Sequence, residues 1–154
     1  MRRFLSVLFL VAFPSLVHAQ SFQLQYAAKF VCGKADTTAG NFAPATYFTT
    51  INVYNTSSPA IDKRIVIALP DEKAGGSTKP IAVTLPNGRA MQIDCKNILG
   101  HLKAEGIPTP ALPVDGFVII RAFTPIDVVG IYTTVASTGI ATMEMERVPE
   151  RKLP

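Results

Sequence analysis

Apolar and polar residues alternate along much of the chain, and a period of two predicts β-strands rather than helices. In residues 24–32, for example, every second residue is apolar or small, so these residues are expected to share one buried face. The predicted inward residues are Leu24, Tyr26, Ala28, Phe30 and Cys32; Tyr47, Ile51 and Val53; Ile61, Ile65, Ile67 and Leu69; Ile81, Val83 and Leu85; Met91, Ile93 and Cys95; and Ala141, Met143 and Met145.

Three other patterns complete the prediction of elements. Asn87 and Gly88 are typical of a two-residue hairpin turn, in which both positions need a positive φ, so the flanking strands are expected to pair. Residues 97–103 are compatible with one or two helical turns. Residues 116–123 and 126–135 are nearly continuous apolar runs, which predict central strands buried on both faces.

Seven to eight short strands with frequent turn signals, and no long amphipathic helix, predict an all-β fold. The expected architecture is an antiparallel β-sandwich, with a barrel as the related alternative and one short helix near 97–103. The predicted domain covers residues 20–148. Residues 149–154 are expected to form a disordered C-terminal tail.

The first 19 residues predict an exported protein. Arg2 and Arg3 precede an apolar run that ends at the small residue Ala19, which is typical of a secretory signal peptide cleaved after Ala19. A membrane anchor is the alternative, but the run is shorter than a bilayer span requires. The expected location is therefore periplasmic or secreted, with no membrane span after signal cleavage.

Signal cleavage changes the charge that the mature chain carries. The full sequence has a net charge of +4. Loss of Arg2 and Arg3 leaves 13 basic and 11 acidic residues, a net charge of +2 without any long basic run. Such a surface does not favour nucleic acid as a partner.

Two cysteines, Cys32 and Cys95, are predicted to form a disulfide, because an exported chain folds under oxidising conditions. A redox pair would normally be a Cys-x-x-Cys motif, which the sequence lacks. A metal site formed by Asp94, Cys95 and His101 is a weaker alternative, since three mixed ligands at irregular spacing are not typical of a metal motif. No cofactor is predicted.

Other candidates for chemistry are few. His101 is the one histidine left after signal cleavage, and it lies in no motif for a Ser-His-Asp hydrolase. Glu144 and Glu146 could serve as paired carboxylates, although their alternation with apolar residues favours a solvated strand face. Asp127 lies in an apolar run, and its expected partner is Arg121 in a buried, structural ion pair.

A shared sequence pattern covers five segments of the chain, residues 26–33, 50–55, 93–95, 116–120 and 126–133. Through these segments the chain resembles a group of small exported bacterial β-sandwich proteins of unknown function. The chain is also similar, more faintly, to the sensory rhodopsin transducers, through the turn Asn55-Thr56-Ser57 and a late pair of strands. Both resemblances imply a β-sandwich, and neither implies an activity.

We therefore expect a non-catalytic exported protein with a binding or structural role in the bacterial envelope or outside the cell. Its partner would be a protein or another envelope component. The alternative is a small metal-binding or hydrolytic enzyme that uses Asp94, Cys95 and His101. A homo-oligomer formed through a strand edge is a further expectation, because open sheets expose edges.

Overall fold

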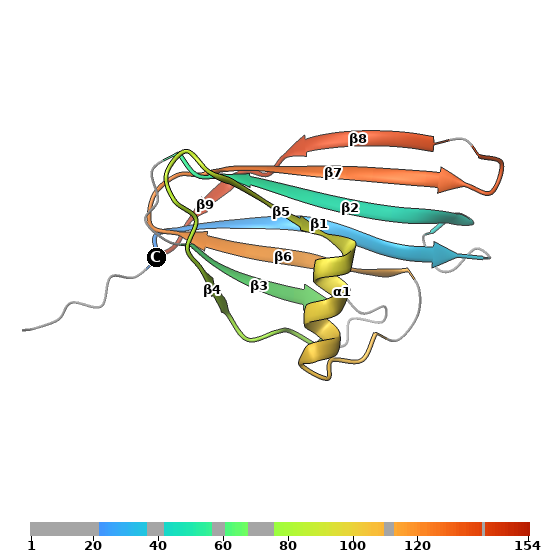
Figure 1. The fold of residues 1–154 in the computed structure, drawn as a ribbon, viewed down its shortest axis with the longest axis horizontal. Helices are drawn as coiled ribbons and strands as arrows, with labels where there is room; N and C mark the ends of the chain where they lie inside the picture. The colour runs from blue at the N-terminus through green and yellow to red at the C-terminus, as the bar shows by residue number, and fades with distance from the viewer. Residues whose placement is uncertain (1–21, 37–41, 57–60, 68–75, 110–112, 140) are drawn as a thin grey trace, which may run out of the picture.

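The computed structural model describes residues 22–36, 42–56, 61–67, 76–109, 113–139 and 141–154. It contains nine strands and one helix in these ranges (Figure 1). They are β1 (Leu24–Ala35), β2 (Ala45–Tyr54), β3 (Ile61–Ile67), β4 (Ile81–Val83), β5 (Ala90–Asp94), α1 (Cys95–Ala104), β6 (Val114–Ala122), β7 (Asp127–Ala136), β8 (Ala141–Arg147) and β9 (Glu150–Lys152). The predicted signal peptide, 1–19, lies outside the described residues. The predicted all-β, antiparallel fold with one short helix is confirmed.

The strands form one continuous network in the order β4-β3-β6-β1-β2-β7-β8, with β5 paired to β2 and β9 paired to β1. Both central strands change neighbour along their length. One edge of β1 pairs with β9 at residues 24–26 and with β2 at residues 33–35. The facing edge of β2 pairs with β1 at residues 45–47 and with β5 at residues 50–54. β1 and β2 therefore diverge beyond their short paired segment. β9 pairs with the unpaired edge of β1, and β5 pairs with the unpaired edge of β2; we call β1 with β9, and β2 with β5, the two arms of the sheet.

The period-two pattern predicts the buried face of β1 correctly. Leu24, Tyr26, Ala28, Phe30 and Cys32 are all buried, and they alternate with half-buried residues. The same core contains residues predicted to face inward on β2 and β5, namely Ile51, Val53 and Ile93. The prediction that Ile61, Ile65, Ile67 and Leu69 face inward concerns side chains that lie outside the described part of the structure.

The long apolar runs give a different result from the one expected. In β6 and the first half of β7, buried residues alternate with half-buried or exposed ones. Phe117, for example, has an exposed fraction of 38%. The prediction that both faces are buried is wrong, because the core covers only one side of these strands.

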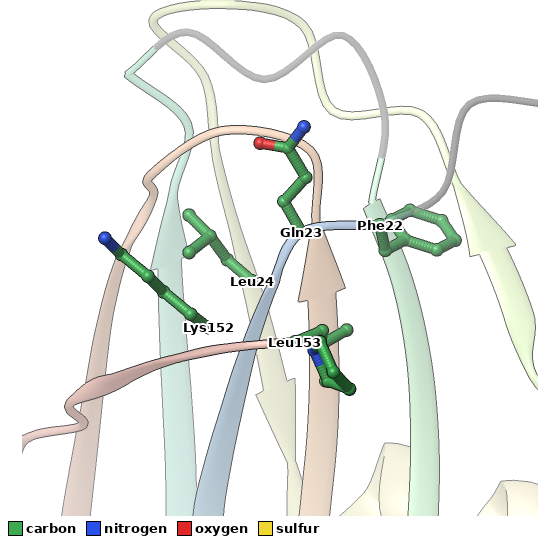
Figure 2. Close-up of a pocket in the computed structure, with 6 residues that line it drawn as sticks. Phe22, Gln23, Leu24, Lys152 and Leu153 are labelled. Atoms are coloured by element: carbon green, nitrogen blue, oxygen red, sulfur yellow. The ribbon is translucent and has the colours of Figure 1, made fainter.

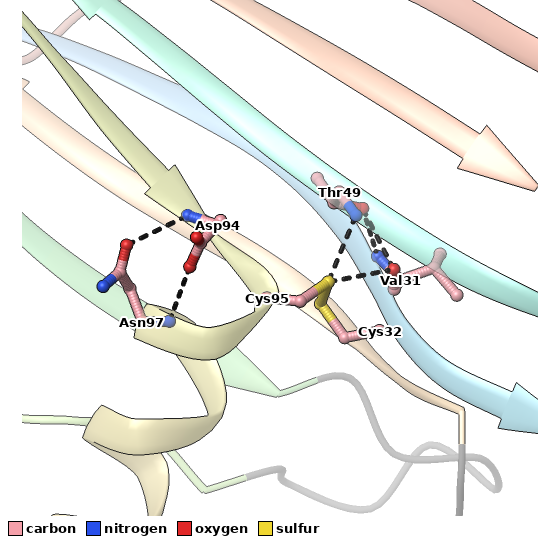
Figure 3. The surroundings of a disulfide bond; sticks show 6 residues. All are labelled: Val31, Cys32, Thr49, Asp94, Cys95 and Asn97. Atoms are coloured by element: carbon pink, nitrogen blue, oxygen red, sulfur yellow. Dashed lines mark hydrogen bonds between the residues drawn. A yellow bond between two sulfur atoms is a disulfide. The ribbon is translucent and has the colours of Figure 1, made fainter.

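The helix α1 begins directly after β5. The Asp94 side chain accepts a hydrogen bond from the Asn97 backbone N–H, and the Asn97 side chain accepts one from the Asp94 N–H, which makes a capping box (Figure 3). Ile98 and Leu102, one turn apart, are fully buried. They hold α1 against the sheet, where it contacts β1, β2, β3 and β5 (Figure 1).

The turn at Asn87 and Gly88 is present, but the predicted hairpin is wrong. Gly88 has a φ of 71°, as the turn requires. β4 nevertheless pairs with β3, and β5 pairs with β2. The buried Asn55 holds this turn instead: its backbone bonds to Arg89 and Gly88, and its side-chain amide donates to the Leu85 carbonyl.

The C-terminal residues are ordered, so the prediction of a disordered tail at 149–154 is wrong. β9 pairs with the start of β1, and the Leu153 N–H donates to the Gln23 carbonyl at 2.8 Å. The buried Tyr26 hydroxyl accepts from the Ile126 N–H at 3.1 Å and donates to the Glu150 carboxylate at 3.3 Å. Burial is the main cause that raises the pKa of Tyr26. The tail is thus fixed by backbone pairing and by one buried phenol.

Candidate functional site

The two cysteines form the predicted disulfide, with a Cα–Cα distance of 5.5 Å. Cys32 lies on β1 and Cys95 is the first residue of α1 (Figure 3). The bond lies where the edge of β2 changes its neighbour from β1 to β5. It therefore joins the two diverging arms of the sheet at the point where backbone pairing is interrupted.

Thr49 fills the same interruption from β2. Its hydroxyl accepts from the Val31 N–H at 2.9 Å and donates to the Val31 carbonyl at 3.0 Å, so one side chain satisfies both backbone groups (Figure 3). The Thr49 N–H in turn lies 3.1 Å from the Cys95 sulfur. Thr49 is 1% exposed, and this buried polar group has a structural role beside the disulfide.

The alternative metal site is not assembled. Cys95 is bonded to Cys32, so its sulfur is not available as a thiolate ligand. Asp94 caps the first turn of α1, whereas His101 lies near the helix C-terminus. No group of three or more potential metal ligands occurs in the described part of the chain.

The predicted ion pair between Arg121 and Asp127 is wrong. The Arg121 side chain donates to Gln25 on β1 at 3.4 Å, and Asp127 binds Arg147 on β8 at 2.7 Å. Arg121 belongs to β6, which pairs with β1 and β3, and Asp127 begins β7, which pairs with β2 and β8. The Asp127 side chain is 43% exposed, so the observed pair is not buried either.

A shallow pocket lies where the two ends of the described chain meet (Figure 2). Beside it, the Phe22 ring stacks on Phe123 with the ring centroids 4.5 Å apart. Lys152 is the one charged side chain among the residues that line this pocket. The lining residues are Phe22, Gln23, Leu24, Lys152, Leu153 and Pro154.

The more informative surface lies on β2, β7 and β8, and we call it the β8 patch. Residues directly opposite each other in neighbouring strands lie on the same face of a sheet. The register places Phe48, Thr133 and Met143 in one row, and Thr50, Ile131 and Met145 in the next. Phe48, Met143 and Met145 have exposed fractions of 49%, 69% and 67%. The β8 patch comprises Phe48, Ile131, Val135, Met143 and Met145.

This exposure overturns the prediction that Ala141, Met143 and Met145 face inward. All seven residues of β8 are exposed, because no other element covers either face of this strand among the described residues. Sequence reasoning also missed Phe48. The signal was present, because Phe48 lies out of phase with the predicted inward residues Tyr47, Ile51 and Val53.

The opposite face of β8 is acidic. Glu144 lies opposite Tyr132, and Glu146 lies opposite Gly130. We call these two glutamates the acidic row. The Tyr132 ring folds over Gly130, where an added Cβ would lie 2.7 Å from the phenolic oxygen, and its hydroxyl reaches the Glu146 carboxylate at 3.5 Å. Partial burial, followed by the Glu146 carboxylate, raises the pKa of Tyr132 to about 12.

The raised pKa predicts a loss of stability in alkali. Between the unperturbed pKa of 10.0 and about pH 12, the folded chain retains a Tyr132 proton that the unfolded chain has lost. The stabilisation is therefore complete below pH 10 and declines as the pH rises to about 12. An absorbance titration of phenolate should show a transition near pH 12 that is absent from Tyr132→Phe. Its persistence in that variant would contradict the assignment.

The outer face of β1 and β6 provides a contrast with the β8 patch. There the exposed Phe117 lies beneath a cation, with the Lys29 ammonium 5.2 Å from the ring centroid. Lys29 also forms an ion pair with Asp115 at 2.5 Å. A charged side chain thus lies over Phe117 on one half of the sheet, whereas Phe48 and the two methionines on the other half are more exposed than Phe117.

Comparison with known proteins shows no family to which the chain belongs. No family model matches it, and no curated protein matches it. A solved structure, the crystal structure of Thermotoga maritima 1070, aligns over 85% of this chain and 95% of that chain, with a TM-score of 0.44 and 13% identity. Among the described residues, no helix has the length and apolar character needed to cross a bilayer.

Proposed function

We propose that the chain is exported to the bacterial periplasm or beyond and acts there by binding another protein, without catalysis. The observation that carries this proposal is the β8 patch, an exposed apolar surface beside a strand edge. Contiguous exposed apolar surface on a folded domain is a common mark of a protein-interaction site. Methionine suits such a surface, because its flexible side chain adapts to different partners.

The disulfide supports the location. Structural disulfides persist in oxidising compartments and are rare where thiols are kept reduced. Cys32–Cys95 joins two arms of the sheet in the core, which fits a structural bond rather than a catalytic one. The basic, then apolar, segment that ends at Ala19 supports export independently.

One experiment tests both location and binding. The full chain is produced in the source bacterium with a photo-crosslinking amino acid in place of Phe48. The intact mass of the purified chain should correspond to cleavage after Ala19, and irradiation of whole cells should give a discrete adduct in the periplasmic or secreted fraction. The control places the same amino acid at Phe117, beneath Lys29 on the other half of the sheet.

The two sites distinguish binding at the β8 patch from unspecific contact. An adduct at position 48 that is absent at position 117, and is lost in the combined variant Met143→Ser and Met145→Ser, supports the proposal. Equal adducts at both positions, or none at position 48, contradict binding at this surface. A chain that retains residues 1–19 in the cytoplasm contradicts export.

A further inference from the structure

Among the described strands that pair with only one other strand, β8 is the longest. Its partner along one edge is β7, and in the described structure the other edge has no neighbouring strand (Figure 1). The other strands with one partner are β4 and β9, with three residues each, and β5, which has five and continues directly into α1. β8 has seven residues, all exposed, and no proline. Its outer edge can therefore pair with another extended chain.

The two faces of β8 differ in chemistry, so the side chains of an added strand would meet a different environment on each face. On one face, Met143 and Met145 continue the β8 patch; on the other, Glu144 and Glu146 form the acidic row. Arg147, the one basic residue of β8, is engaged by Asp127 at 2.7 Å. An added strand would thus meet apolar side chains on one face and carboxylates on the other.

A second copy of this chain fits that pattern poorly. A twofold axis between two antiparallel β8 strands, perpendicular to the sheet, places residues of the same parity opposite each other. With the strand centres aligned, Glu144 of one copy lies opposite Glu144 of the other, and in a neighbouring register Glu144 of each copy lies opposite Glu146 of the other. Like charges directly opposite each other destabilise a strand pair. Charge complementarity favours a different, cationic partner.

We propose that β8 receives an extended segment of a partner protein, which adds to the sheet as an edge strand and alternates Lys or Arg with apolar residues. Its cationic residues would lie against Glu144 and Glu146, and its apolar residues against Met143 and Met145. Backbone hydrogen bonds to the free edge would supply affinity, and the alternating side chains specificity. This inference rests on the proposed function and specifies the partner's chemistry.

The test uses the mature chain and a labelled seven-residue peptide that alternates Lys and Val, matching the length of β8. Fluorescence anisotropy should show saturable binding that weakens with added salt. A peptide of the same composition with its lysines and valines in separate blocks should bind at least about tenfold more weakly, as should a Glu-Val alternating peptide. Equal binding of the alternating and block peptides would overturn the proposal.

Backbone methylation separates strand addition from charge attraction alone. Two further peptides are N-methylated at either the lysines or the valines. In an added strand, alternate amides point toward β8, so one isomer should lose binding and the other should retain it. Retention by both isomers would mean that no strand forms, and loss by both would mean that the peptide does not bind as a simple edge strand. Either result overturns the proposal.

Variants assign the peptide to β8. The combined variant Glu144→Gln and Glu146→Gln should weaken binding about threefold to tenfold, as expected for two exposed ion pairs. The matched control, Glu105→Gln, changes the C-cap residue of α1, a helix that does not contact β8, and should bind as the parent does. Unchanged melting temperatures would verify folding. Sedimentation that shows a dimer formed through β8 would overturn the choice of partner.

Failure of this inference is distinguishable from failure of the proposed function. If the alternating peptide does not bind but the adduct at position 48 forms in cells, the β8 patch still binds a protein and the partner's chemistry is wrong. If neither occurs, both proposals fail.

Discussion

Replacing Cys32 and Cys95 together by alanine is expected to lower the free energy of unfolding by about 4 kcal/mol. The disulfide joins residues 63 positions apart, and in the chain-entropy model a bond over this distance restricts the unfolded chain by about that amount. It also closes the junction of β1, β2 and β5, where backbone pairing is interrupted. Equilibrium denaturation in urea, monitored by circular dichroism, measures the change.

Reduction of the parent protein is the matched control. A strong reductant should lower its stability by about as much as the double substitution does, and should leave the substituted protein unchanged. A loss below about 1 kcal/mol in both experiments would contradict a main stabilising role for the bond. The slope against urea should also rise in the variant, because its unfolded chain exposes more surface without the cross-link.

Thr49→Val is expected to destabilise the fold by about 2 kcal/mol, the second-largest effect. Valine keeps the shape of threonine but removes the hydroxyl that satisfies both the N–H and the carbonyl of Val31. A partly buried donor or acceptor left without a partner costs about 1–3 kcal/mol. Amide hydrogen exchange should show faster exchange of the Val31 N–H, since this hydrogen bond would be lost.

Thr49→Ser is the control for this variant, because serine retains the hydroxyl and loses a methyl group. It should protect the Val31 N–H nearly as well as threonine does. If Thr49→Val were as stable as the parent, or if both variants exposed the Val31 N–H equally, the hydroxyl would have no bridging role between β1 and β2.

The sequence predicts those features that depend on local patterns. Alternation identifies the buried face of β1, since the side chains of a strand point to opposite faces in turn. The expected oxidising compartment identifies the cysteine pair, and the sequence of residues 97–103 locates α1 within a few residues of its observed bounds. Each of these depends on neighbouring residues or on the redox environment.

Features that depend on which strands pair with each other could not be predicted from local sequence patterns. The Asn87-Gly88 turn fixes the local chain direction, but it does not specify that β4 joins β3 while β5 joins β2. Asp127 meets Arg147 because β7 pairs with β8, a register that no short motif encodes. The candidate site was missed for the same reason: alternation in β8 indicates two distinct faces, and only the full sheet shows that neither is covered.

The pairing of β9 with β1 has a consequence for the timing of folding during synthesis. β1 begins at Leu24, while its edge partner β9 ends at Lys152, so this pair cannot form before residue 152 has been synthesised. Contacts between residues so distant in sequence also form slowly. If the chain is exported as proposed, late closure of the first strand would leave this pair unformed while the precursor crosses the membrane. The adjacency of Gln23 and Leu153 also suits circular permutation, in which a linker joins these two positions and the chain is opened elsewhere.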